Sequence, residues 1–432
     1  MKPSSGLWAA LMLALAVNAA ATTRPNIIFV LLDDLGYGDL SAYGSELIAT
    51  PNIDALAEQG LKLTSYYAPA NVCTPSRAAL LTGRQPVRMG LARDVIRPDS
   101  THGLPQSEKT LATLLKEDGY RTAMIGKWHL GHMPEFWPTA HGFERFFGVP
   151  YSNDMTPFPL YEGDEVIEEP ADQARLTERY TDATIAFIEE AGDDPFFIYL
   201  AHTFPHIPLY ASERFRGQSE AGLYGDTVET IDWSMGRIVR ALEEAGVADD
   251  TLIMFTSDNG PWFEGASGAS RDRKGATFEG AYRVPFIAHW PAGLPVSRVI
   301  DAAVTGLDMF PTLARIAGVP VPEDIELDGA DIWPVLSEGA ESPHEAILFF
   351  NGDQIAAIRM GDWRLVVRSY YKTLDIPLGT LGYPLLFDLA RDPGENYSMA
   401  PDEPDQVERM LRAIEAARER LDVPEPPPFP PQ

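Results

Sequence analysis

The chain of 432 residues contains a single cysteine, which excludes any disulfide bond within it. Basic residues are also scarce, because 34 Lys and Arg stand against 63 Asp and Glu and give a formal net charge of −29. Nucleic acids and anionic membranes select basic surfaces, so this balance argues against both as partners. An anionic small-molecule substrate would need a pocket where positive side chains or a metal ion are concentrated.

The N-terminal apolar run is too short for a comfortable membrane span. Residues 7–17 are apolar, follow the basic Lys2 and precede small residues at 18–21, a pattern typical of a secretory signal peptide. A buried first helix is the alternative, which the flanking residues disfavour. We predict a signal peptide at 1–21, export to the periplasm or the exterior, and no stable membrane insertion.

Short apolar runs alternate with amphipathic helical patterns along most of the chain, which predicts an α/β domain with a large, mostly parallel sheet between helices. The expected strands are 26–32, 122–125, 196–201 and 252–256. One expected helix carries apolar residues at 111–115 and stops at Gly119, and another carries them at 228–242 and stops at Gly246.

The composition changes near 327–343, a stretch rich in Gly, Pro, Ser and acid that reads as a linker. Strand-like runs follow at 346–350, 354–359 and 363–368, then a helix at about 405–421 and a Pro-rich tail. These patterns predict a large domain at 22–340 and a C-terminal subdomain at 341–432, with a small antiparallel sheet and a packed helix.

Polar side chains follow each of the four predicted strands of the large domain. Each cluster has an ordinary explanation, since Asp-Asp can cap a helix and Asp-Asn-Gly is a common turn. Carboxyl ends of parallel strands share one sheet edge, however, where ligands of such sheets bind. The clusters are Asp33-Asp34, Gly126-Lys127-Trp128-His129, His202 to His206, and Ser257-Asp258-Asn259-Gly260.

The residues expected to bind metal at this edge offer oxygen atoms, which favours a hard cation, Ca²⁺ or Mg²⁺, over zinc. Adjacent carboxylates would repel one another without a metal between them. The expected ligands are Asp33, Asp34, Asp258 and Asn259.

The single cysteine, Cys73, precedes a short predicted helix that contains Pro75 and ends at Gly83. A lone cysteine is most often a small buried apolar residue. A helix N-terminus, however, favours anions and activated thiols. Arg77, one turn further on, could reach back to the cysteine or to the carboxylates.

These segments together resemble the type I, formylglycine-dependent sulfatases. Residues 73–84, Cys-Thr-Pro-Ser-Arg-Ala-Ala-Leu-Leu-Thr-Gly-Arg, are similar to the family signature Cys-x-Pro-Ser-Arg with its Thr-Gly-Arg ending. Further similar segments are 26–39, 126–131, 257–260, 274–285, and Phe387-Asp-Leu with Asp392-Pro-Gly-Glu; Gly148 to Asp154 resembles the arylsulfatase A-like branch. Two positions depart from the pattern: Gly280-Ala281 replaces a glycine pair, and Arg271-Asp-Arg precedes Lys274 where glycine is usual.

The resemblance implies an alkaline-phosphatase-like α/β/α sandwich, in which 22–340 is the catalytic domain. It implies conversion of Cys73 to formylglycine by a formylglycine-generating enzyme, and a bound Ca²⁺ in preference to Mg²⁺. Asp33, Asp34, Asp258, Asn259 and the modified residue 73 would hold the ion. The formylglycine would be hydrogen-bonded by Arg77 and His129. The sulfate and the leaving oxygen would be contacted by Lys127, His206 and Lys274, with Ser152 nearby. His206 fits the family segment better than His202.

The activity implied is hydrolysis of an aryl or carbohydrate sulfate, in which a formylglycine hydroxyl attacks sulfur and a covalent sulfate-enzyme is resolved through the second hydroxyl. Asp258 would take the first proton and His129 the second. The expected partner is a sulfated small molecule or glycan. A phosphodiesterase or phosphonate monoester hydrolase of the same superfamily is the alternative, and a catalytically silent sulfoglycan-binding protein is a third. We expect specificity to reside in loops such as 155–170 and 262–272, while the sequence leaves the natural substrate and the oligomeric state open.

Overall fold

The computed structural model describes residues 24–371 and 374–424, so the signal peptide predicted at 1–21 and the tail beyond 424 lie outside the described residues. Within these ranges, ten strands form one sheet in the order β11-β2-β10-β9-β1-β8-β4-β5-β6-β7. Its central five strands, β9 to β5 in this order, are parallel. The strands are β1 Asn26–Leu32, β2 Leu61–Leu63, β4 Arg121–Lys127, β5 Arg145–Val149, β6 Leu160–Glu162, β7 Glu165–Glu168, β8 Phe196–Ala201, β9 Thr251–Ser257, β10 Phe286–His289 and β11 Arg298–Ile300.

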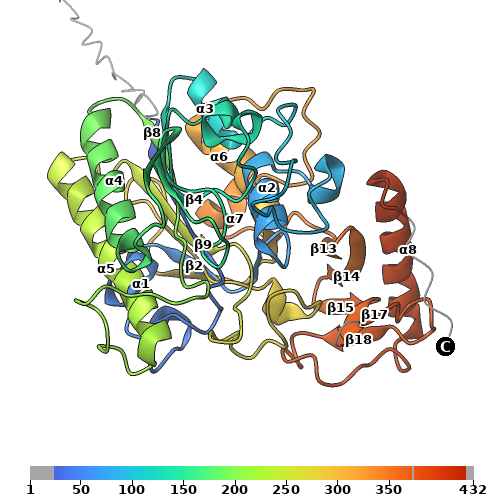
Figure 1. The fold of residues 1–432 in the computed structure, drawn as a ribbon. Coiled ribbons are helices and arrows are strands. Elements are labelled where there is room, and N and C mark those ends of the chain that lie inside the picture. Colours follow the sequence, from blue (N-terminus) through green and yellow to red (C-terminus); the bar gives the residue numbers. More distant parts are fainter. Residues whose placement is uncertain (1–23, 372–373, 425–432) are drawn as a thin grey trace, which may run out of the picture.

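Helices cover both faces of this sheet, so the predicted α/β/α sandwich is confirmed (Figure 1). Strand β1 shows why: Ile28, Val30 and Leu32 pack toward one helical layer, and the residues between them pack toward the other. The first layer consists of α1 Pro51–Gln59, α4 Leu176–Ala191 and α5 Gly222–Ala245, and the second of α2 Cys73–Thr82, α3 Leu111–Glu117, α6 Met309–Ala317 and α7 Trp333–Glu338.

Helix α5 ends where its sequence predicted, because Gly246 adopts the left-handed conformation, with φ of 73°, and caps it. Strand β4 instead extends two residues beyond the predicted end and includes Lys127. The apolar run stops at Gly126, but the backbone continues to pair with β5 and β8. A Cβ atom on Gly126 would lie 1.8 Å from the carbonyl oxygen of Ala201, so only glycine permits this close approach.

The C-terminal subdomain contains a four-stranded antiparallel sheet, as the sequence predicted, with the strand order β13-β14-β15-β18. Helix α8, Pro404–Arg420, packs on it through Met410 and Ile414. The strands are β13 Ile347–Asn351, β14 Gln354–Met360, β15 Trp363–Val366 and β18 Leu385–Asp388, and the short pairs β3 Tyr66–Tyr67 with β12 Val304–Thr305 and β16 Ser369–Tyr371 with β17 Leu374–Ile376 lie outside both sheets.

The reading of 327–343 as a linker is wrong for its central part. That stretch forms α7, and its Ile332, Val335 and Leu336 are buried in the core of the large domain. The glycine and proline residues there cap and start a short helix: Pro334 lies in the first turn and Gly339 takes a left-handed φ of 74° at the end. In the described part of the chain, no helix is both long and apolar enough to cross a membrane.

Candidate active site

The predicted metal ligands meet at the carboxyl ends of β1 and β9. Carboxylate oxygens of Asp33, Asp34 and Asp258 and the sulfur of Cys73 all lie within 4.8 Å of one another, and all four residues are buried. The backbone N–H of Asp34 donates to Asp258 Oδ1 at 3.2 Å, and Asn259 Nδ2 donates to Asp34 Oδ1 at 2.7 Å. Asp34 adopts a left-handed φ of 65°, a conformation that a non-glycine residue keeps only where its surroundings hold it.

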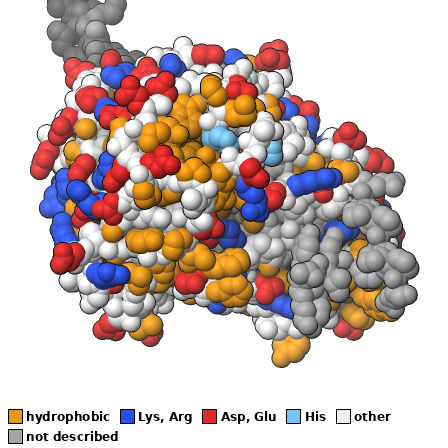
Figure 2. Space-filling model, viewed as in Figure 1, with side chains coloured by type: hydrophobic (Ala, Val, Ile, Leu, Met, Phe, Trp, Pro, Cys, Tyr) orange, Lys and Arg blue, Asp and Glu red, His pale blue; other side chains and the backbone are white. Residues whose placement is uncertain are grey.

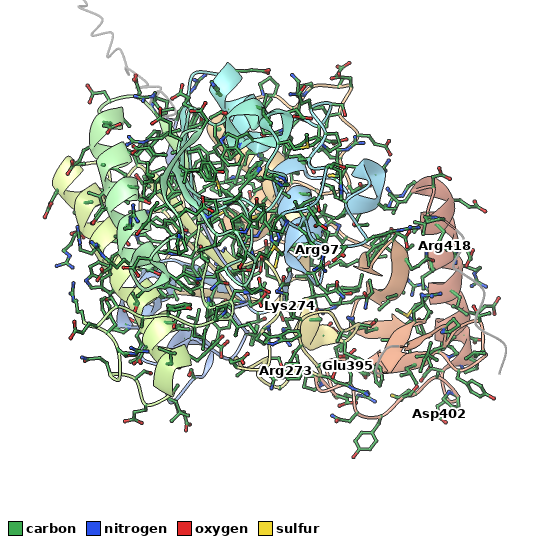
Figure 3. All side chains as sticks on the ribbon, in the orientation of Figure 1. Arg97, Arg273, Lys274, Glu395, Asp402 and Arg418 are labelled. Atoms are coloured by element: carbon green, nitrogen blue, oxygen red, sulfur yellow. The ribbon has the colours of Figure 1, made fainter. Side chains whose placement is uncertain are left out.

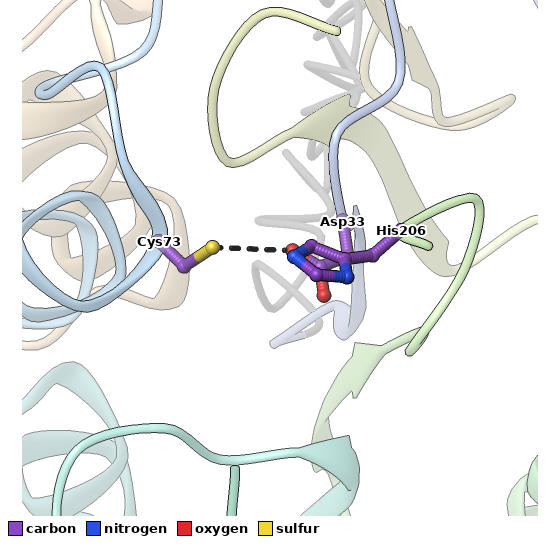
Figure 4. A group of neighbouring side chains, drawn as sticks. All are labelled: Asp33, Cys73 and His206. Carbon is purple, nitrogen blue, oxygen red and sulfur yellow. Dashed lines mark hydrogen bonds between the residues drawn. The ribbon is translucent and has the colours of Figure 1, made fainter. Parts of the chain in front are cut away.

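Cys73 is the first residue of α2, and its side chain points toward Asp33 and His206 (Figure 4). Its sulfur lies 3.4 Å from Asp33 Oδ1 and 3.3 Å from Lys274 Nζ. In a formylglycine hydrate, this is the place that the hydroxyl oxygens would take. Burial raises the pKa of the Cys73 thiol, so the helix N-terminus does not activate the unmodified thiol as the sequence suggested.

Arg77 lies one turn along α2 and is fully buried. Its Nε and Nη2 atoms are each 2.9 Å from Asp258 Oδ2, and its Nη1 donates to the carbonyl of Lys127 at 2.7 Å. A weaker ion pair reaches Asp33 Oδ1 at 3.5 Å. The guanidinium therefore fixes the end of β4 against the carboxylates that follow β1 and β9.

Two lysines complete the charge balance of the site. Lys127 Nζ lies 2.5 Å from Asp33 Oδ2 and donates to Ser152 Oγ at 2.8 Å, while Lys274 Nζ lies 2.7 Å from Asp34 Oδ1. Burial alone would raise the pKa of Asp33, yet Lys127 and the neighbouring cationic groups hold it well below its usual value. Burial would lower the pKa of Lys274, but the carboxylate of Asp34 raises it well above, so Lys274 carries its charge.

His129 is held as a neutral imidazole with one free ring nitrogen. Its Nε2 lies 2.9 Å from the carbonyl oxygen of Ile96, which can only accept, so Nε2 carries the proton. Nδ1 is buried and has no hydrogen-bond partner among the described residues, which leaves its lone pair available. Burial lowers the pKa of His129 well below its usual value, and the positive charges of Lys127 and Arg77 lower it further.

A threonine inside the cysteine motif holds this geometry in place. Thr74 Oγ1 donates to the carbonyl of His129 at 2.8 Å and accepts from the N–H of Ile96 at 3.0 Å. His129 itself has a left-handed φ of 60°.

His206 reaches the site from the segment after β8. Its Nε2 lies 3.3 Å from Ser152 Oγ and 3.7 Å from Asp34 Oδ2. Its Nδ1 faces two acceptors, the carbonyl of Ile207 at 2.5 Å and Asn153 Oδ1 at 3.0 Å, and therefore carries a proton. Burial lowers the pKa of His206, and the carboxylate of Asp34 partly opposes this effect.

His202 lies outside the group of candidate catalytic residues. It is fully buried, and in the described residues neither of its ring nitrogens has a hydrogen-bond partner. It packs beside Tyr180, with ring centroids 6.3 Å apart. Burial lowers its pKa to about 3, so the ring stays neutral. Of the two candidates for the leaving-group acid, only His206 lines the cavity described below.

The cluster at the strand ends fits a hard divalent cation. It presents three carboxylates and an amide, and Asn259 Oδ1 is buried without a hydrogen-bond partner among the described residues. Burial raises the pKa of Asp258 to about 6; repulsion from the carboxylates of Asp33 and Asp34 adds to the increase, and Arg77 opposes it. An oxygen-ligating ion such as Ca²⁺ would satisfy the amide oxygen and offset that repulsion.

A cavity of about 270 Å³ opens above these side chains. Cys73, His129, Ser152, His206 and Lys274 form its catalytic end. Of the two loops expected to determine specificity, 155–170 contributes Met155 and 262–272 contributes Trp262. Sequence reasoning missed other residues of the walls. Asp154 ends the segment 148–154 but was given no role there, and the remaining residues belong to no motif: Val72, Asp94, Val95, Arg97 and Ile207.

The two departures from the family pattern have structural explanations. A Cβ at Gly280 would lie 2.2 Å from the carbonyl oxygen of Asp272, so the first glycine of the pair is required, whereas Ala281 is simply buried. Arg271 and Arg273, which stand where glycine is usual, tie the loop down. Arg271 donates to the carbonyl of Glu395 in the C-terminal subdomain at 3.0 Å, and Arg273 donates to that of Trp262 at 3.2 Å.

Comparisons with known proteins agree with this geometry. The sulfatase family model matches residues 25–319, and the model for the C-terminal region of aryl-sulfatase matches 342–424. Arylsulfatase A of Bos taurus is 39% identical over 94% of this chain and 89% of its own length. N-acetylgalactosamine-6-sulfatase of Canis lupus familiaris is 36% identical over 88% of this chain and 83% of its own.

Among solved structures, that of Ps i-CgsB in complex with k-i-k-neocarrahexaose superimposes with a TM-score of 0.82. It is 30% identical and the match covers 94% of this chain and 95% of that one. The chain therefore belongs to the sulfatase family and is an arylsulfatase A-like enzyme that hydrolyses sulfate esters.

Proposed function

We propose that this enzyme cleaves the sulfate monoester of an aryl or carbohydrate alcohol through a formylglycine at position 73, with Ca²⁺ as its metal. The observation that carries the proposal is the convergence of one cysteine, three carboxylates and the side chains of Arg77, Lys127 and Lys274 in a buried cluster. Relatives named for aryl and for N-acetylgalactosamine substrates support both kinds of alcohol.

Asp33, Asp34, Asp258, Asn259 and residue 73 would hold the ion. Bound there, Ca²⁺ would supply positive charge that lowers the pKa of a neighbouring hydroxyl and stabilises charge on the sulfate. As formylglycine hydrate, residue 73 would offer one hydroxyl to attack sulfur and a second whose deprotonation allows sulfate to leave.

The chain's own cations would bind the sulfate. Lys274 Nζ lies 3.3 Å from the sulfur of Cys73, Lys127 pairs with the neighbouring Asp33, and each lysine already neutralises one aspartate of the metal cluster. Their ammonium groups, with Ser152 Oγ between Lys127 and His206, would orient the sulfate oxygens and oppose the charge that develops on them. Arg77 would act by fixing the carboxylates and by hydrogen-bonding residue 73.

Two histidines and one aspartate would move the protons. Asp258, whose carboxylate lies within 4.8 Å of the sulfur of Cys73, would accept the proton of the attacking hydroxyl. His206 would take up a proton at Nε2 and donate it to the leaving oxygen. His129 has its Nδ1 lone pair free and would accept the proton of the second hydroxyl.

The proposal also covers the modification of Cys73 and the export of the chain. A formylglycine-generating enzyme would convert Cys73 before or during folding, because the side chain is buried afterwards. The predicted signal peptide at 1–21 would direct the chain to the periplasm or beyond, and 22–340 and 341–432 would form the catalytic domain and the C-terminal subdomain.

The test is a panel of 4-nitrophenyl sulfate, phosphate and phosphonate esters with protein made beside a formylglycine-generating enzyme. We expect the sulfate ester to turn over fastest, and Cys73→Ala to abolish its turnover while the thermal unfolding midpoint changes little. Faster turnover of the phosphorus esters, or full activity in Cys73→Ala, would refute the proposal.

A further inference from the structure

The walls of the catalytic cavity come from three segments that are far apart in the sequence. Residues 94–97 form one side, Asp154 and Met155 another, and Trp262 a third. Figure 3 shows Arg97 and Lys274 near the middle of the molecule, between the large sheet and the C-terminal subdomain. With a volume of about 270 Å³, the cavity falls below the range of sites for drug-sized ligands, roughly 300–1,000 Å³. After the sulfate is placed, the enclosed part of the cavity has room for about one ring.

Trp262 presents an aromatic surface beside the catalytic Lys274. The indole is 36% exposed, and the ring of Phe263 meets it edge to face at 4.8 Å. The loop is fixed at this point, because the N–H of Lys274 donates to the carbonyl of Pro261 at 3.0 Å and Arg273 donates to that of Trp262 at 3.2 Å. These contacts hold the backbone at Trp262, and its indole can support the flat, apolar face of a ring.

Away from the catalytic end with its Lys274, the charged side chains of the walls are two acidic residues and one arginine. Asp94 and Asp154 stand against Arg97, whose Nη2 already lies 3.5 Å from Asp94 Oδ2. Carboxylates accept hydrogen bonds from hydroxyl groups but repel a second sulfate or carboxylate. The net charge of −29 repels polyanions at longer range as well. Figure 2 shows acidic and basic side chains interspersed around the apolar middle of this face.

We propose that this cavity binds the alcohol part of the substrate as a single neutral sugar ring, and that it discriminates against a second anionic group. The ring would stack on Trp262, and its hydroxyls would donate to Asp94 and Asp154. This inference rests on the proposed function, because it places the sulfate ester at residue 73. Specificity would then arise as much from repulsion of the wrong ligand as from attraction of the right one.

Competition against hydrolysis of 4-nitrophenyl sulfate tests this without knowledge of the natural substrate. The two probes are N-acetylglucosamine 6-sulfate and N-sulfoglucosamine 6-sulfate, which differ at one substituent by one negative charge. We expect the singly charged sugar to inhibit with an inhibition constant roughly three- to tenfold lower, the effect of a charge–charge repulsion of about 1 kcal/mol near a surface. If the disulfated sugar inhibits equally or better, or if neither competes, the inference is overturned.

Variants identify the residues responsible. Asp154→Asn should bring the two inhibition constants closer together by about threefold or more, and so should Asp94→Asn, which also frees Arg97. Asp99→Asn should leave their ratio unchanged, because Asp99 lies in the same loop as Asp94 but outside the cavity lining. Trp262→Ala should weaken both sugars about fivefold to tenfold, and Trp262→Phe should recover much of the loss. Tyr397→Ala is the control, since Tyr397 is an aromatic residue that is 80% exposed and does not line the cavity.

The outcomes separate this inference from the proposed function. If converted enzyme fails to hydrolyse 4-nitrophenyl sulfate at all, the proposed function fails. The neutral-ring inference alone fails if the converted enzyme hydrolyses that ester but Trp262→Ala binds the sugars as the native enzyme does. It also fails alone if the Asp variants leave the ratio of inhibition constants unchanged.

Discussion

At the scale of single residues, the motifs identified the groups that meet in the buried cluster but not the contacts that orient them. Asp33, Cys73 and Lys274 lie together in a buried site, and each belongs to a segment that the sequence singled out. The proton on His206 Nδ1 is fixed by the carbonyl of Ile207, and that on His129 Nε2 by the carbonyl of Ile96. Backbone carbonyls carry no sequence signal, so these tautomers could not be predicted.

His206 and His202 differ enough in surroundings to separate their roles by mutation. His206→Asn should lower kcat by about 10²–10⁴-fold for a sugar sulfate, whose leaving alcohol needs a proton, and by much less for 4-nitrophenyl sulfate. The matched change His202→Asn lies outside the cavity lining and should affect thermal stability more than kcat. Equal losses of kcat on both substrates in His206→Asn would argue against a role as leaving-group acid.

At the scale of helices and strands, buried apolar runs predicted the central parallel strands because hydrophobic burial on two faces leaves a plain pattern. The edges were harder to predict. Strands β6 and β7 carry mostly exposed residues, and β2 and β11 have three residues each, so none of them shows a recognisable period. The helix α7 was hidden by the glycine and proline residues that bound it.

The close approach of β4 to β8 makes a prediction about folding. Gly126→Ala should destabilise the protein by about 3 kcal/mol or more, because the added Cβ would meet the carbonyl oxygen of Ala201 at 1.8 Å. Gly119→Ala is the control: its φ of 92° is also left-handed, but no atom lies within 4 Å of the added methyl group. Chemical denaturation of both variants measures the difference, and similar losses would show that the clash is relieved at little cost.

The cation that the strand ends would hold should also stabilise them. Treatment with a chelator should abolish turnover and lower the thermal unfolding midpoint, and Ca²⁺ should restore both more effectively than Mg²⁺. An ion at about 100 times its Kd adds about 2.7 kcal/mol to the free energy of unfolding. Asp258→Asn, which removes one carboxylate of the cluster, should weaken the response to Ca²⁺. A midpoint and an activity insensitive to chelation would contradict a metal at this site.

At the scale of the whole molecule, a buried charge network joins the C-terminal subdomain to the large domain. Arg364 pairs with Glu279 at 3.1 Å and with Glu395 at 3.0 Å, and Glu395 also accepts from the N–H of Glu279 at 2.7 Å. The sequence predicted a subdomain here and singled out Glu395 within Asp392-Pro-Gly-Glu. It gave no sign of the Arg364 pairing, since partners 31 residues or more apart share no local pattern.

This network should make stability depend on pH. Burial, opposed by Arg364, raises the pKa of Glu395 from 4.5 to about 7. The folded state thus binds the proton more tightly than the unfolded state, so Glu395 contributes stability below pH 4.5 that is lost as the pH rises to about 7. The thermal midpoint of the native protein should therefore fall relative to that of Glu395→Gln over this range.

The control for that comparison is Glu415→Gln, which removes a carboxylate from an exposed position of α8. Its midpoint should follow that of the native protein across the same pH range. If the native protein instead gains stability relative to Glu395→Gln as the pH rises, the ion pair with Arg364 outweighs the burial of the carboxylate.

The central claim is that residue 73 works as a formylglycine among carboxylates and cations. Mass spectrometry of the tryptic peptide 63–77, from enzyme made beside a formylglycine-generating enzyme and shown to hydrolyse 4-nitrophenyl sulfate, tests it most directly. We predict the mass of the aldehyde in place of the thiol, in a proportion that rises and falls with specific activity. A fully active preparation in which this peptide carries only unmodified cysteine would contradict the account.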